Sequence, residues 1–213
     1  MSEPKTAFIT GINGQDGSYL TELLLNKGYT VVGLVRRLSV PESQTSRLEE
    51  AKVYPHKNLH LEYGDLTDQS SLFRILNRYK PDEIYNLGAQ SHVRVSFDAP
   101  QFTTDVIAMG TLNLLEAMRE ICPNAKMYQA GSSEMFGNSI DDDGFQRETT
   151  PMHPVSPYGC AKLYAHNLCQ TYRHSYNMFV SNGILFNHES SRRGGNFVTN
   201  KIVAGAVDIY KGK

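Results

Sequence analysis

The sequence predicts an α/β fold built on a doubly wound parallel sheet, with helices packed on both faces of that sheet. Strand-like and helix-like segments alternate along the whole chain of 213 residues. The first strand-like segment runs directly into a cluster of glycines that opens a helix. A second segment, residues 30–35, is rich in β-branched residues, which favour buried strands. A chain of this length buries a sizeable core without disulfide bonds or a structural metal.

The first half of the chain supplies three expected strands and two expected helices. Residues 7–10 are a short apolar strand that ends at the glycines, and residues 19–25 belong to the helix that follows. Residues 30–35 form the β-branched strand. Residues 59–63 alternate between apolar and polar side chains, which is typical of a strand. Residues 70–79 are amphipathic at helical spacing, so we expect a helix there.

The second half continues the alternation. Residues 83–87 form a strand that ends before a Gly-Ala pair, and residues 106–121 form a long helix closed by a Cys-Pro-Asn sequence. Residues 127–130 are a strand that stops at a Gly-Ser-Ser sequence. Residues 158–176 form a helix, and residues 179–186 form the last strand. In such a sheet, ligands bind at the carboxyl ends of the strands, where the strand order reverses.

Composition argues against several classes of protein. The net charge is −1 and no basic block stands out, so nothing indicates a nucleic-acid partner. The start of the chain lacks the apolar core of a signal peptide, and no apolar run approaches membrane-spanning length, so we expect a cytoplasmic protein without membrane contact. Cys122, Cys160 and Cys169 form no Cys-x-x-Cys unit and are expected as reduced thiols. The acidic run at 141–143 is expected to be a solvated turn, and no metal site is predicted.

The glycine cluster has the spacing Gly-x-x-Gly-x-x-Gly between a strand and a helix. Gly11 permits the tight turn, Gly14 lets the backbone approach a pyrophosphate, and Gly17 allows close packing of the helix on the sheet. The helix start adds free N–H groups and the positive end of the helix dipole. We therefore expect a Rossmann fold with a dinucleotide at this turn. The alternative is an ordinary strand-to-helix turn with incidental glycines.

Two arginines at the end of the second strand indicate which dinucleotide binds. Arg36 and Arg37 lie where an acidic residue would bind a ribose hydroxyl, and no carboxylate follows until Glu42. A guanidinium pairs with a phosphate and gains nothing from a neutral ribose. This favours NADP over NAD, with solvated surface arginines as the alternative. Asp65, after the third strand, suits an adenine amino group or else caps a helix or stabilises a turn.

Tyr158 and Lys162 stand one helical turn apart and are the strongest catalytic signal in the chain. A tyrosine is a poor base at neutral pH, because its ordinary pKa is about 10. An ammonium group beside it favours the phenolate and is expected to lower that pKa. Ser132, at the end of a strand, would hydrogen-bond the substrate oxygen that Tyr158 deprotonates. The set predicts oxidation or reduction of a carbinol; for Tyr158, a buried helix aromatic is the alternative.

Glu134 separates one class of reaction from another. A simple alcohol dehydrogenase needs only the serine, tyrosine and lysine. A carboxylate two residues after Ser132 would lie at the same strand end and could remove the acidic hydrogen on the carbon beside a newly formed ketone. An oxygen on the next carbon would then leave as water, assisted by Ser132 or by the protonated Glu134. The resulting enone could take back the hydride. The alternative is a surface or ion-paired glutamate.

Four segments make the chain similar to one known family: residues 10–20, 87–93, 133–134 and 182–190. They resemble the GDP-mannose 4,6-dehydratases, which are extended short-chain dehydrogenases/reductases. The resemblance implies conversion of GDP-mannose into GDP-4-keto-6-deoxymannose with internally recycled NADP. It also implies Glu134 as the base at C5 of the sugar, Tyr158 as the base at the 4-hydroxyl, and Lys162 as the partner of Tyr158 and a ribose ligand. Ser132 stands where the family usually has Thr, which keeps the hydroxyl.

The resemblance also implies binding residues and an assembly. The loop that holds Arg36 and Arg37 resembles one that, in this family, reaches the cofactor of a neighbouring subunit, which implies a homo-oligomer, a dimer or a tetramer. The expected NADP contacts are Gly11, Asn13, Gly14, Gln15, Asp16, Gly17, Arg36, Arg37, Ser39, Asp65, Leu66, Leu87, Gly88, Ala89, Gln90, Ser91, Lys162, His188 and Arg193. The expected substrate contacts are Ser91, Ser133, Asn187 and Glu189.

The length of the chain sets a further expectation. The family normally continues into a smaller domain that holds the sugar nucleotide, so that C-terminal substrate domain is expected to be missing or truncated here. We expect residues 1–213 to be an NADP-binding Rossmann domain, with a substrate-binding region that starts at about residue 187 and a helix at 197–210. NADP should bind to these residues, and GDP-mannose only weakly.

Two alternative functions stay open at this point. The first is a sugar-nucleotide 4-epimerase, which would oxidise and re-reduce C4. Glu134 argues against it, because epimerisation needs no base at C5. The second is a catalytically silent NADP-binding module, and the complete Ser/Glu/Tyr/Lys set argues against that.

Overall fold

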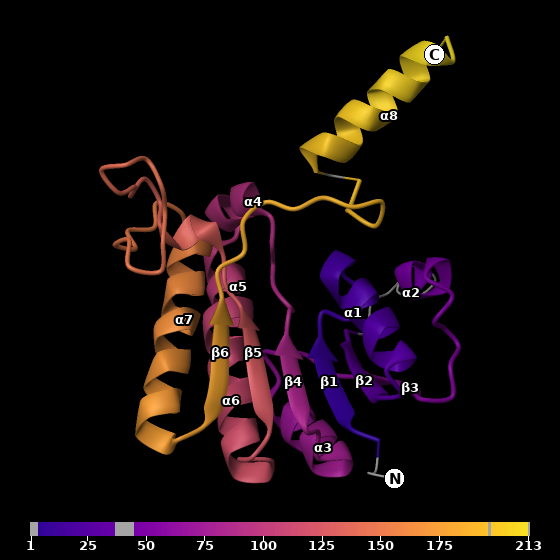
Figure 1. Cartoon of the computed structure of the whole chain (residues 1–213), viewed down its shortest axis with the longest axis vertical. Coiled ribbons are helices and arrows are strands. Elements are labelled where there is room, and N and C mark those ends of the chain that lie inside the picture. The colour runs from indigo at the N-terminus through magenta and orange to yellow at the C-terminus, as the bar shows by residue number, and fades with distance from the viewer. Residues whose placement is uncertain (1–3, 37–44, 196, 213) are drawn as a thin grey trace.

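A computed structural model describes residues 4–36, 45–195 and 197–212. Within these ranges, six parallel strands form one sheet in the order β3-β2-β1-β4-β5-β6 (Figure 1). The order runs in opposite directions from the central β1/β4 pair, which confirms the predicted doubly wound parallel sheet. The strands are β1 (Thr6–Thr10), β2 (Thr30–Val35), β3 (Leu59–Tyr63), β4 (Glu83–Asn86), β5 (Lys126–Ala130) and β6 (Phe179–Gly183).

Helices connect the strands. They are α1 (Gln15–Asn26), α2 (Ser46–Glu50), α3 (Gln69–Tyr79), α4 (Val93–Asp98), α5 (Pro100–Thr104), α6 (Gly110–Ile121), α7 (Pro157–Tyr176) and α8 (Val198–Tyr210), with a π-helical turn η2 (Asp105–Met109) and a 3-10 turn η3 (Ser133–Met135). Among the described residues, no helix is both long enough and apolar enough to cross a membrane.

Both faces of the sheet are buried, because alternate residues of a strand point to opposite sides. On one side, Phe8 of β1 belongs to a core that includes Leu72 of α3 and Leu115 of α6. On the other side, Ile9 belongs to a separate core with Leu24 of α1. The predicted cover of helices on both faces is therefore confirmed.

Several predicted boundaries differ from the structure. The helix predicted at 106–121 belongs to a helical stretch that starts at Pro100, whose fixed φ suits a first helical position. The strand predicted at 179–186 ends at Gly183, because its neighbour β5 ends at Ala130, the residue paired with Gly183. The helix predicted at 19–25 begins at Gln15, since its first turn lacks the apolar spacing used for prediction. The short helices α2 and α4 were not predicted.

The loops after β1 and β4 meet where the strand order reverses. The chain after β1 forms α1 on one face, whereas the chain after β4 leads to α6 on the other face. Gly11 has φ +70°, and a Cβ on it would lie 2.9 Å from the backbone N of Gly88. Only glycine allows two loops to approach this closely in that conformation. The reversal opens a crevice above the carboxyl ends of the strands.

The last helix, α8, lies apart from the sheet and its covering helices (Figure 1). None of its residues is buried, and its apolar side chains stay in solvent; Ile202 is 65% exposed and Ile209 is 77% exposed. Its bounds agree with the helix predicted at 197–210. The helix contributes nothing to the two cores described above.

Candidate active site

A cleft of about 450 Å³ lies above the carboxyl ends of the central strands. It gathers most of the residues that the sequence analysis proposed. The proposed residues that line it are Gly11, Asn13, Gly14, Gln15, Asp16, Gly17, Arg36, Asp65, Leu66, Leu87, Gly88, Ala89, Ser91, Ser132, Ser133, Glu134, Tyr158, Lys162, Asn187, His188 and Arg193. One concave site therefore holds both the glycine turn and the candidate catalytic set.

Among the proposed residues that the structure describes, Gln90 and Glu189 are not in this lining. Gln90 uses its side chain within its own loop: its Oε1 accepts from the N–H of His92 at 2.8 Å, and its Nε2 donates to Thr103 Oγ1 at 3.1 Å. Glu189 points toward Arg193, with 3.7 Å between its Oε2 and Arg193 Nε. Arg37 and Ser39 lie outside the described residues.

The glycine turn forms a cradle of backbone groups. The N–H of Gly14 donates to the carbonyl of Gly11 at 2.9 Å, and α1 begins at the next residue without a side-chain cap. The N–H groups of the first turn are therefore available to an anion. A Cβ on Gly17 would lie 2.3 Å from the carbonyl oxygen of Gly11, so α1 packs against the turn as only glycine permits. This geometry fits the phosphates of a dinucleotide.

The catalytic candidates meet because η3 packs against the first turn of α7. Ser132 caps η3, and its Oγ accepts from the N–H of Glu134 at 3.2 Å. The Oγ of Ser156 caps α7 by accepting from the N–H of Gly159 at 3.0 Å. A Cβ on Gly159 would lie 2.6 Å from the carbonyl oxygen of Glu134, which shows how closely the two elements approach. This contact brings Tyr158, the second residue of α7, to Ser132 and Glu134.

Lys162 is buried one turn further along α7. Its Nζ donates to the carbonyl of Ala130 at 2.8 Å and lies 5.8 Å from the centre of the Tyr158 ring. Burial lowers the pKa of Lys162 to about 8. The ammonium is therefore fixed by the end of β5, on the floor of the cleft.

The expectation that Lys162 lowers the pKa of Tyr158 is wrong for the protein as described. The pKa of Tyr158 is raised from its ordinary value, and burial is the largest cause. A hydrogen bond with Ser132 and the charge of Arg193 act in the opposite direction, whereas the carboxylate of Glu134 raises the pKa further. Lys162 is not among the groups that shift the pKa of Tyr158.

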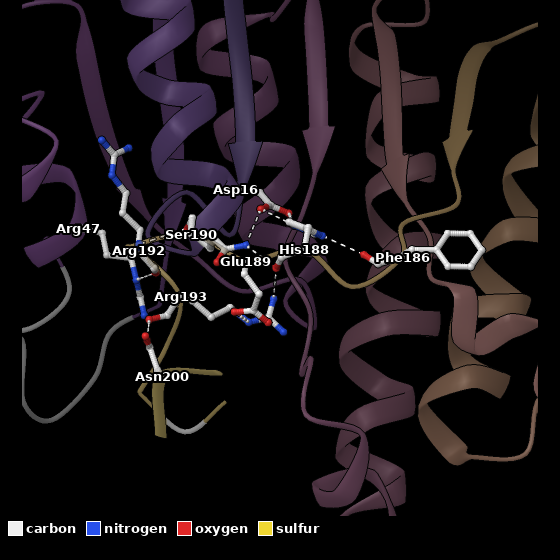
Figure 2. Close-up of polar contacts among 10 residues, drawn as sticks. Asp16, Arg47, Phe186, His188, Glu189, Ser190, Arg192, Arg193 and Asn200 are labelled. Carbon is white, nitrogen blue, oxygen red and sulfur yellow. Dashed lines mark hydrogen bonds and ion pairs between the residues drawn. The ribbon is translucent and has the colours of Figure 1, made fainter. Parts of the chain in front are cut away.

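The segment 186–195 forms one wall of the cleft and is tied to α1 (Figure 2). Nε2 of His188 lies 2.8 Å from Oδ1 of Asp16, and Nδ1 of His188 donates to the carbonyl of Phe186 at 3.0 Å. The carbonyl and Asp16 together raise the pKa of His188. Nη2 of Arg192 pairs with Glu22 at 2.7 Å. These contacts fix the wall beside the glycine turn.

Asp65 has two roles in the site, and several residues not proposed earlier also line the cleft. Oδ1 of Asp65 accepts from both the N–H and the hydroxyl of Thr67 at 2.8 Å, so Asp65 stabilises a turn while it lines the cleft. Arg47 and Phe197 also line the cleft. Neither lies in a recognisable motif: Arg47 follows a polar segment, and Phe197 precedes α8. The sequence carried no signal that would have found them.

The fold and the cleft define a Rossmann domain of the extended short-chain dehydrogenase/reductase class. Residues 8–213 match the sequence model of the GDP-mannose 4,6 dehydratase family, and the chain belongs to that family. This confirms the resemblance stated from the sequence motifs.

Relatives called GDP-mannose 4,6 dehydratase are 51% to 55% identical to this chain over nearly its whole length. A GDP-mannose 4,6 dehydratase from Homo sapiens is 51% identical over 220 residues, covering 100% of this chain and 58% of its own length. The Vibrio cholerae GDP-mannose 4,6-dehydratase is 54% identical, covering 98% and 56%. The Arabidopsis thaliana GDP-mannose 4,6 dehydratase 2 is 55% identical, covering 93% and 54%. The chain thus spans somewhat more than half the length of these relatives.

Solved structures share the fold. A dTDP-glucose 4,6-dehydratase from Streptomyces venezuelae, with NAD and TYD bound, superimposes with a TM-score of 0.83 at 23% identity, covering 95% of this chain and 62% of that one. A UDP-glucuronic acid 4-epimerase from Bacillus cereus, with UDP-glucuronic acid and NAD, gives 0.83 at 24% identity, covering 95% and 63%. At these identities the likeness supports the Rossmann architecture and nothing finer.

Proposed function

We propose that this chain carries the cofactor-binding and catalytic part of a GDP-mannose 4,6-dehydratase, a hydro-lyase that forms GDP-4-keto-6-deoxymannose. The observation that carries the proposal is the position of Glu134. The packing of η3 on α7 puts this carboxylate in the same cleft as Ser132, Tyr158 and Lys162. Elimination of water needs a base beside the residues that oxidise C4. Simple oxidation or epimerisation at C4 does not need this second base.

The cleft fits a nicotinamide dinucleotide. The uncapped start of α1 and the glycine turn would hold its pyrophosphate, and Leu87 to Ala89 would border it above β4. The bound dinucleotide supplies the hydride acceptor at C4 and the hydride that returns at C6. Membership of the GDP-mannose 4,6 dehydratase family supports the assignment of a nicotinamide dinucleotide.

The side chains have separate roles in this proposal. Tyr158 takes the proton of the 4-hydroxyl, and Ser132 holds the same oxygen by a hydrogen bond. Glu134 removes the proton at C5 once C4 is a ketone. The proton then held by Glu134, or the hydroxyl of Ser132, assists the 6-oxygen to leave as water. To act as this base, Tyr158 must first release its own proton to solvent, and burial opposes that release because it raises the pKa of the hydroxyl.

Substitutions at Glu134 and Tyr158 test the reaction in the protein that contains this sequence. Glu134→Gln should still allow oxidation at C4 but block loss of the C5 hydrogen, so a bound reduced cofactor and a 4-keto sugar should accumulate. Tyr158→Phe should abolish the oxidation itself. Absorbance at 340 nm measures the reduced cofactor, and NMR measures deuterium exchange at C5. Normal turnover of Glu134→Gln with solvent deuterium at C5 would exclude Glu134 as the base.

We infer that the cofactor is NADP, because Arg36 lines the cleft at the end of β2, where the adenosine ribose of a Rossmann dinucleotide lies. A guanidinium paired with the 2′-phosphate contributes about 1.5–3 kcal/mol, or roughly 10- to 100-fold in affinity. Calorimetric titration of both cofactors into the 213-residue protein measures this. Arg36→Ala should weaken NADP and leave NAD almost unchanged, and Arg78→Ala serves as a control outside the cleft. Equal affinity for NAD and NADP would contradict the assignment.

A further inference from the structure

Arg47 donates hydrogen bonds to two backbone segments that are far apart in sequence. Its Nη1 donates to the carbonyl of Asn13 at 2.9 Å, and its Nε donates to the carbonyl of Arg192 at 2.9 Å. These acceptors lie 34 and 145 residues from Arg47. One acceptor, Asn13, belongs to the glycine turn, and the other, Arg192, belongs to the wall segment 186–195. Figure 2 shows Arg47 beside Arg192.

The carbonyl of Asn13 belongs to a residue that lines the cleft, at the turn where the phosphates of a dinucleotide would bind. The carbonyl of Asn13 is part of the glycine turn, and a carbonyl oxygen without a donor repels an anion. The guanidinium of Arg47 pairs with that oxygen and adds a positive charge at the same point. The carbonyl of Arg192 immediately precedes Arg193, whose Nη1 donates to the carbonyl of His188 at 3.2 Å.

The remaining ties between the wall and the turn are of another kind. The contacts of Asp16 with His188 and of Glu22 with Arg192 join side chains of α1 to the wall. Arg47 instead joins the backbone of the wall to the backbone of the turn. Its planar guanidinium offers donors in a fixed fork, which suits two acceptors held at a set distance. A lysine ammonium is a single point of charge on a flexible stem and does not reproduce the fork.

We propose that Arg47 is a positioning residue for dinucleotide binding. This proposal rests on the proposed function. It holds the glycine turn and the wall segment 186–195 at the separation that the phosphates require. The positive charge of Arg47 alone is not sufficient for dinucleotide binding. The hydrogen bond to Arg192 fixes the position of the wall segment and makes no contact with the ligand. Arg47→Lys should therefore behave like Arg47→Ala.

Hydrogen exchange of the ligand-free protein tests the tie directly. Peptides that cover residues 11–17 and 186–195 should exchange faster in both Arg47→Ala and Arg47→Lys than in the wild type. Arg78→Ala is the matched control, because Arg78 pairs with Glu62 at the surface and does not line the cleft. Far-UV circular dichroism and thermal unfolding of each variant establish that it is folded. Unchanged exchange of both peptides in folded Arg47→Ala overturns the proposal.

Titration of NADP into the same proteins gives the second readout. Both Arg47 variants should bind about tenfold more weakly, as expected for loss of charge-assisted hydrogen bonds, whereas Arg78→Ala should match the wild type. Wild-type affinity in Arg47→Lys would show that charge is sufficient and would overturn the proposal. Wild-type affinity in Arg47→Ala would also overturn it and would leave the proposed function intact. Absence of dinucleotide binding by the wild type would instead overturn the proposed function.

Discussion

At the scale of single residues, Lys162 is a charged group that is almost entirely buried at the floor of the cleft. Only 4% of the residue is exposed, and its Nζ has one hydrogen bond, to the carbonyl of Ala130. Burial disfavours the charged form and lowers its pKa from 10.5 to about 8. At neutral pH the lysine is still protonated, so the folded state carries the cost of an incompletely solvated charge.

Replacing this lysine by an apolar residue of similar length should therefore stabilise the protein. Lys162→Met removes a penalty of up to about 3 kcal/mol and loses one hydrogen bond worth about 1 kcal/mol. We expect Tm at pH 7 to rise by a few degrees, at roughly 2–4 °C per kcal/mol for a chain of this size. Catalysis should be lost in the same variant. A fall in Tm would show that the ammonium stabilises the fold.

The pH dependence of stability gives an independent check on Lys162. Between the folded pKa of about 8 and the ordinary value of 10.5, the unfolded chain binds more protons than the folded protein. Stability should therefore rise with pH across that window. Other groups titrate there too, so the informative quantity is the difference between the urea unfolding free energies of the wild type and Lys162→Met. A difference that does not change between pH 8 and 10 would contradict the lowered pKa.

The sequence predicted most of the residues that share the cleft, but it did not predict the direction in which the pKa of Tyr158 is shifted. Ser132 and Glu134 follow a strand, and Tyr158 follows a Ser-Pro helix start, so topology alone brings them to one edge of the sheet. The pKa of Tyr158 depends on how deeply α7 and its neighbours bury the hydroxyl, and no local pattern encodes that depth. Arg47 was missed for a related reason, since both of its partners are backbone carbonyls.

At the scale of elements, the close contact between α1 and the glycine turn makes a sharp prediction. Gly17→Ala would place a Cβ 2.3 Å from the carbonyl oxygen of Gly11, so the helix must move away from the turn. We expect a loss of about 1–3 kcal/mol in unfolding free energy, and a loss of dinucleotide binding. Gly205→Ala in α8 is the control, because a Cβ there meets nothing within 4 Å. Chemical denaturation and calorimetry measure both effects, and an unaffected Gly17→Ala would refute the packing argument.

Element boundaries were predictable where apolar periodicity or a strong cap defined them. Asp68 caps α3 by accepting from the N–H groups of Ser70 and Ser71, and the predicted bounds of that helix differ from the structure by one residue at its start. The stretch from Pro100 to Gly110 contains a π-helical turn, which shifts the helical phase and hides the periodicity. The end of β6 depends on where its neighbour ends, which is information from another part of the chain.

At the scale of the whole molecule, α8 presents apolar side chains to water. Val198, Ile202, Ile209 and Tyr210 are each at least 65% exposed. Exposed apolar surface of this kind promotes association. We expect the 213-residue protein to self-associate as its concentration rises.

Sedimentation velocity over a range of concentrations tests this expectation. The double variant Ile202→Lys/Ile209→Lys should lower the weight-average sedimentation coefficient at high concentration, because charges replace the apolar surface. Thr199→Lys adds a charge to the same helix at an exposed polar position and should have little effect. Identical concentration dependence in all three proteins would contradict a role for α8.

The ties between α1 and the wall segment also bear on the order in which the protein folds. Asp16 and His188 are 172 residues apart, and Glu22 and Arg192 are 170 apart. The entropy of loop closure grows with such separation, so contacts of this kind form after local ones. A growing chain that has reached the end of α7 contains the glycine turn but not the wall opposite it. The two sides of the dinucleotide site therefore come together only after β6 and the wall segment 186–195 have joined the fold.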